Sequence, residues 1–184
     1  MTTPSENALD QTIQWFNRVV LGLNLCPFAH NPAKLNAIRW VVVDYPSPNS
    51  LLESIAAEIE MLRASSEQAL ATTVLVAPTG FEEFDDYLDM LAFLNDWLDE
   101  TGNHQDFQLA SFHPLYQFDG LDVSDRANWT NRSPLPLFHI IREASITRVT
   151  EAGADTESIP ERNIETIEKL PAKKMRELFP HFDE

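Results

Sequence analysis

Hydrophobic positions in the middle of the chain alternate between two periodicities. Short apolar, β-branched runs at 37–43, 72–76 and 107–112 are typical of buried strands. Between them, apolar residues recur three or four positions apart, which predicts amphipathic helices over about 50–62 and 84–98. Strands that alternate with helices favour parallel pairing through right-handed crossovers. The pattern therefore predicts an α/β fold with a short, mostly parallel sheet of three or four strands, flanked by helices.

Helical periodicity also marks the two ends of the chain. A helix is predicted over about 8–22, after a loose N-terminus at 1–6, and HNPAKLN (30–36) is predicted to be a loop. After a polar break, residues 151–184 predict a helical tail that packs on the domain. A fourth strand within 115–121 is left open. The length of 184 residues suits one domain, residues 1–184.

One further helix is predicted from Ser133 to about Val149. Ser133 is a good N-cap residue, and Pro134 would occupy the first helical position. Pro136 would also fall within the first turn, where proline is tolerated. The candidate chemistry below depends on this helix.

Charge and composition exclude several classes of protein. The net charge is −16 and the pI is about 4.5, so the surface repels phosphate backbones and anionic lipid, and neither nucleic acid nor a membrane is expected as a partner. No apolar run approaches the ~20 residues that span a bilayer. A polar, acidic start and a single cysteine, which allows no intrachain disulfide, favour a cytoplasmic location. No glycine-rich or Walker motif for a nucleotide cofactor is present.

Chemistry-bearing side chains concentrate between Ser111 and Ser145. In open parallel sheets, ligands bind outside the carboxyl ends of the strands. In this chain those ends carry Asp44, the turn at 79–80 and His113. A functional site is therefore expected at that edge of the sheet, with residues 111–145 around it.

The predicted helix places His139, Arg142 and Glu143 on one face, since they are three or four positions apart. We expect His113 and His139 to move protons and Glu143 to orient His139. A second interpretation is a divalent metal such as zinc or iron, held by His113, His139, Glu143 and Asp122. A third is an ordinary surface ion pair, and His113 also fits a structural role at a strand end.

The start of the same helix predicts a site for a small anion. Free N–H groups and the positive end of the helix dipole attract phosphate or carboxylate. Asn131 and Arg132 would bind the anion, and Arg142 would help if the fold turns it back. The alternative is that Arg132 pairs with a structural carboxylate such as Asp122.

The single cysteine, Cys26, precedes Pro27 at a predicted helix C-terminus. A thiolate there gains nothing from the helix dipole, so a buried, inert thiol is expected. Thiol catalysis would need a nearby histidine, and His30 is the local candidate.

Three segments, LNLCPFA (23–29), FHPLYQF (112–118) and NRSPLPLFHIIRE (131–143), resemble a bacterial family of unknown function, DUF 1415. The resemblance covers nearly the whole chain and implies a small bacterial cytoplasmic protein. It implies no catalytic residue. The residues themselves favour an enzyme that acts on a small anionic metabolite. A non-catalytic ligand-binding or protein-interaction domain and a metalloenzyme are the alternatives.

Overall fold

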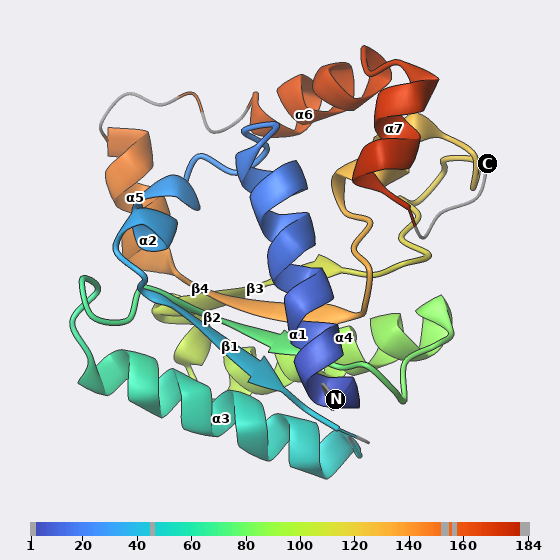
Figure 1. The fold of residues 1–184 in the computed structure, drawn as a ribbon. Helices are drawn as coiled ribbons and strands as arrows, with labels where there is room; N and C mark the ends of the chain where they lie inside the picture. Colours follow the sequence, from blue (N-terminus) through green and yellow to red (C-terminus); the bar gives the residue numbers. More distant parts are fainter. Residues whose placement is uncertain (1–2, 45–46, 152–154, 156–157, 181–184) are drawn as a thin grey trace.

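The computed structural model describes residues 3–44, 47–151, 155 and 158–180. A single four-stranded sheet lies between two layers of helices (Figure 1). The strand order is β1-β2-β4-β3. The strands are β1 (Ile38–Val42), β2 (Thr72–Val76), β3 (Phe107–Phe112) and β4 (Leu137–Arg142). The α/β class and the three strands expected from the hydrophobic runs are confirmed.

The sheet is mixed, so the prediction of a mostly parallel sheet is wrong. Only β1 and β2 pair in parallel, and β4 is antiparallel to both β2 and β3. Strands β1, β2 and β3 still point the same way, as the alternation with helices predicts. The chain leaves β3, returns through residues 113–136 and inserts β4 between β2 and β3. The alternation of strands with helices predicts the direction of the strands but not which strands lie next to each other in the sheet.

Strand β4 replaces the first half of the helix predicted over 133–149, and that prediction is wrong. Phe138 and Ile140 are fully buried on one face of the sheet, and Leu137 is buried on the other. A central strand that is buried on both faces shows a continuous apolar run, which periodicity alone does not separate from a helix. Helix α5 (Glu143–Glu151) begins where the strand ends.

Two long amphipathic helices cover the lower face of the sheet in Figure 1. They are α3 (Pro48–Ala64) and α4 (Phe84–Glu100), close to their predicted positions. Their buried leucines and isoleucines pack against Leu75, Phe138 and Ile140 of the sheet. The face of the sheet that α3 and α4 cover is therefore a closed apolar core. Further along the chain are two short 3-10 helices, η2 (Asn103–Gln105) before β3 and η3 (Arg126–Thr130) after it.

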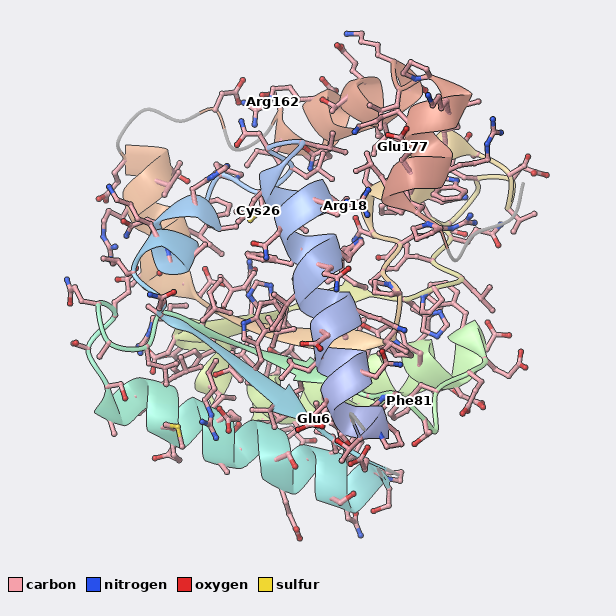
Figure 2. The ribbon with its side chains drawn as sticks, viewed as in Figure 1. Glu6, Arg18, Cys26, Phe81, Arg162 and Glu177 are labelled. Atoms are coloured by element: carbon pink, nitrogen blue, oxygen red, sulfur yellow. The ribbon has the colours of Figure 1, made fainter. Side chains whose placement is uncertain are left out.

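The upper face carries the helices from both ends of the chain. They are α1 (Pro4–Trp15), its π-helical continuation η1 (Phe16–Leu21), α2 (His30–Lys34), α6 (Ile159–Glu168) and α7 (Ala172–Leu178). The helices α6 and α7 confirm that the predicted tail is helical, and its residues 152–154, 156–157 and 181–184 lie outside the described part. The guanidinium of Arg18, in η1, donates to the carbonyl of Glu177 in α7 at 2.6 Å (Figure 2).

Two local predictions at the N-terminal end are corrected. Residues 3–6 are not loose, because Thr3 and Glu6 form a capping box that starts α1. Residues 1 and 2 lie outside the described part. The segment HNPAKLN is not only a loop, since it contains α2.

Tyr87 of α4 fastens the sheet to the lower layer. Its hydroxyl donates to the carbonyl of Leu137 at 2.6 Å and accepts the N–H of Phe112 at 3.1 Å, and its side chain is fully buried. Tyr87→Phe leaves the buried carbonyl of Leu137 and the partly buried N–H of Phe112 without this partner. We expect a loss of about 1–3 kcal/mol in the free energy of unfolding, measured by urea denaturation.

Tyr116→Phe is the matched control. The Tyr116 hydroxyl lies 3.3 Å from that of Ser111, and its side chain is only partly buried. This substitution should cost well under 1 kcal/mol. Equal losses in the two variants would contradict the role given to Tyr87.

Candidate functional site

The sequence-predicted site residues lie in separate parts of the structure. His113 follows β3 at the carboxyl edge of the sheet. Glu143 follows β4 at the opposite edge, where its N–H donates to the carbonyl of Asp106 at 2.9 Å. Six residues of β4 separate these edges, which corresponds to roughly 20 Å. The structure therefore does not bring His113 and Glu143 together.

His113 is fully buried and both its ring nitrogens are bonded to backbone. Nε2–H donates to the carbonyl of Phe81 at 2.8 Å, and Nδ1 accepts the N–H of Leu115 at 3.0 Å. Burial lowers the pKa of His113, and this pair of bonds suits the neutral ring. The arrangement matches the structural role that the sequence left as an alternative.

Arg132 and Asn131 hold the segment 113–131 in place. The Arg132 guanidinium donates to the carbonyls of Tyr116 and Val123 at 3.2 and 2.8 Å and stacks on the ring of Trp129. The Asn131 amide donates to the carbonyl of Ser111 at 3.1 Å. No helix begins here, so the free N–H groups expected of an anion site are not supplied.

Asp122 does not pair with Arg132. It is exposed, and its carboxylate accepts the N–H and hydroxyl of Ser124, which lowers its pKa. Within the described part of the chain, no carboxylate forms an ion pair with Arg132.

Arg142 and His139 lie on opposite faces of the sheet. Both belong to β4, in which side chains alternate between faces, and they are three positions apart. The Arg142 guanidinium donates to the carbonyls of Leu62, Ser65 and Leu70, and so caps the carboxyl end of α3 on the lower face. The prediction that His139, Arg142 and Glu143 share one face is wrong.

The possible metal site is not assembled either. In the described residues, no group of three His, Cys, Asp or Glu side chains is placed to hold a metal ion. The four residues of the metal hypothesis lie on β4, at the start of α5, at the carboxyl end of β3 and on the exposed Asp122 loop.

His139 instead lines a pocket on the upper face, between the sheet, α2 and α5. The pocket has a volume of about 110 Å³. Its floor comes from β1, β2 and β4, one wall from the Cys26–Pro32 segment and the other from α5. The lining residues are Phe16, Cys26, Pro27, Phe28, Ala29, Asn31, Pro32, Ile38, Glu67, Ala71, Thr72, Val74, His139, Ile141, Ser145, Arg148 and Val149.

A threonine on the neighbouring strand holds the ring of His139. Nε2 of His139 lies 2.7 Å from Oγ1 of Thr72, and that hydroxyl lies 2.5 Å from the carbonyl of Ile140. A carbonyl only accepts, so the Thr72 hydroxyl donates to it and accepts Nε2–H from His139. Burial lowers the pKa of His139 to about 4, so the ring is neutral at pH 7.

A salt bridge ties α5 to the segment after α3 at the rim of the pocket. The carboxylate of Glu67 accepts from both terminal nitrogens of Arg148, at 2.9 and 2.5 Å, and from the hydroxyl of Ser145 at 2.9 Å. The Arg148 hydrogen bonds lower the pKa of Glu67. The rim thus holds one neutralised pair of charges.

Cys26 lies in the wall of the pocket beside α2 (Figure 2). Burial raises the pKa of its thiol, although the N–H groups of Phe28 and Ala29 point toward the sulfur. His30, which the sequence offered as a thiol partner, bonds the side chain of Asn24 at 2.9 Å. The imidazole that shares the pocket with Cys26 is His139.

The fold and this pocket define an α/β protein with one mixed sheet and a small, partly open pocket on one of its faces. The chain belongs to the family described as "Protein of unknown function (DUF1415)", whose sequence model matches residues 7–177. No curated protein and no solved structure shows significant similarity. Two of the segments that resemble the family, 23–29 and 131–143, meet at the pocket through Cys26 and His139.

The low pKa of His139 makes stability depend on pH. The unfolded chain binds a proton on this residue near its ordinary pKa of 6.5, while the folded chain binds it only near pH 4. The contribution of neutral His139 to the free energy of unfolding is therefore fully present above about pH 6.5 and is lost as the pH drops toward 4. The difference between the two pKa values sets this contribution at no more than about 3 kcal/mol.

The free energy of unfolding, measured by urea denaturation from pH 4 to 8, tests this expectation. The wild type should lose more stability toward pH 4 than His139→Gln, so the difference between the two profiles should change across that window. A constant difference between wild type and variant would show that His139 is not held neutral.

Proposed function

We propose that this protein binds a small molecule in the pocket between α2, α5 and the upper face of the sheet, with His139 at its floor. The observation that carries the proposal is the pocket itself, where apolar walls surround a few polar groups. Such concave, mostly apolar sites with a small number of placed polar groups are typical of ligand sites.

The size of the pocket limits the ligand. An apolar cavity of ~150 Å³ accommodates benzene, so about 110 Å³ suits a single ring or a short branched chain. A larger ligand would place only one such group inside and extend past the Glu67–Arg148 rim. The walls supply aromatic and proline surfaces from Phe16, Phe28 and Pro32 for the apolar part.

An enzyme that acts on a small anionic metabolite is the second candidate. One observation favours it, since Arg132 is 8% exposed and its guanidinium has no carboxylate partner in the described part of the chain. Burial lowers its pKa, which fits a cation that lacks a counter-charge. Its bonds to Tyr116 and Val123 favour a structural role over this candidate.

Binding is tested by titrating the ¹⁵N-labelled protein with single-ring fragments such as toluene, phenol and benzoate. We expect chemical-shift changes at pocket residues, including Val74, His139 and Val149, and slower alkylation of Cys26, the only cysteine, measured by intact mass. Inorganic phosphate serves as the probe for the second candidate, with changes near Arg132 that Arg132→Ala abolishes.

A pair of tryptophan variants locates the site. Ile141→Trp adds an indole to the pocket floor and should abolish fragment binding. Ala144→Trp adds the same group three residues later on the exposed side of α5 and should leave binding intact. Chemical-shift changes that spread over other surfaces, or that persist in Ile141→Trp, would contradict the proposal. The absence of any fragment binding would contradict it too.

A further inference from the structure

The hydrogen bond to Thr72 leaves one nitrogen of His139 without a partner. Nε2–H is donated to Thr72, so the neutral ring carries a lone pair on Nδ1. Nδ1 makes no hydrogen bond within the described residues. The buried unpaired side-chain atoms found there are Nε1 of Trp15 and Nε of Arg142. The free Nδ1 is therefore not sealed inside the protein, and it belongs to a residue that lines the pocket.

Most other polar groups around the pocket already have partners. The Glu67 carboxylate is bonded by Arg148 and Ser145, and the Thr72 hydroxyl bonds Ile140. The amide of Asn31 lies on the exposed rim. His139 thus supplies a fixed hydrogen-bond acceptor at the floor of the pocket.

We propose that the pocket selects an uncharged ring or short apolar group that carries one hydrogen-bond donor, a hydroxyl or N–H, directed at Nδ1 of His139. This inference rests on the proposed function and specifies its ligand class. The donor would replace the water that Nδ1 otherwise needs, while the apolar body fills the space between Phe16, Phe28 and Val74.

The same geometry disfavours an anionic group at the floor. A carboxylate offers only lone pairs, and these would face the lone pair of Nδ1. The one cation among the residues that line the pocket, Arg148, is paired with Glu67 in a bidentate salt bridge. An anion there would have to displace Glu67 and leave a second carboxylate unpaired.

Phenol and toluene form a matched pair of probes, because they differ by a hydroxyl in place of a methyl group. Their dissociation constants are measured by NMR titration at pH 7 for the wild type, His139→Leu and Thr72→Val. We expect the ratio of phenol to toluene affinity to fall about 3- to 10-fold in His139→Leu, as suits one neutral hydrogen bond. Benzoate should bind more weakly than phenol to the wild type.

Thr72→Val keeps the imidazole and removes the hydroxyl that fixes its tautomer, together with the hydrogen bond from that hydroxyl to the carbonyl of Ile140. The phenol preference should fall there too, because Nδ1 is then free to carry the proton. If His139→Leu fails to fold, the ratio of phenol to toluene affinity in Thr72→Val still tests the inference. If toluene and phenol bind and neither variant changes their ratio, or if benzoate binds most tightly, the inference is overturned while the proposed function stands. If none of the three probes binds the wild type, the proposed function itself fails.

Discussion

The antiparallel insertion of β4 between β2 and β3 is the constraint on which the rest of the structure depends. It pairs with both neighbours and buries Phe138 and Ile140 below the sheet and Leu137 above it. The strand period of two then sends His139 to the upper face and Arg142 to the lower one. His139 therefore lies in the floor of the pocket, while Arg142 donates hydrogen bonds to carbonyls at the carboxyl end of α3.

Much of the fold is predictable because its elements have long or unambiguous patterns. The helices α3 and α4 show regular apolar spacing over 17 residues each, and β1, β2 and β3 are short β-branched or aromatic runs. The prediction fails for residues 133–142 because their pattern is ambiguous. Their prolines fit a helix start as well as an extended approach, and a doubly buried strand shows no alternation. Only the pairing with β2 and β3, which is tertiary information, decides between the two.

Of the polar residues that line the pocket, the sequence predicts a functional role only for His139. The sequence points to His139 through its spacing to Glu143, but in the structure its ring bonds Thr72, which lies 67 positions away in the chain. The Glu67–Arg148 pair spans 81 positions, and Cys26 reaches the pocket from another segment again. No local pattern reports contacts of this kind. Polar residues cluster around His113 and Arg132 in the sequence, but in the structure both side chains bond backbone groups and hold loops in place.

The state of the His139 ring is the point at which fold, stability and ligand choice meet. A two-bond ¹H–¹⁵N correlation spectrum of the histidine rings at pH 7 measures it directly, with His139→Gln to assign the signals. The account predicts a single neutral tautomer for His139, with the proton on Nε2 and a bare Nδ1, and loss of that preference in Thr72→Val. A proton on Nδ1, or an averaged mixture of tautomers in the wild type, would contradict it.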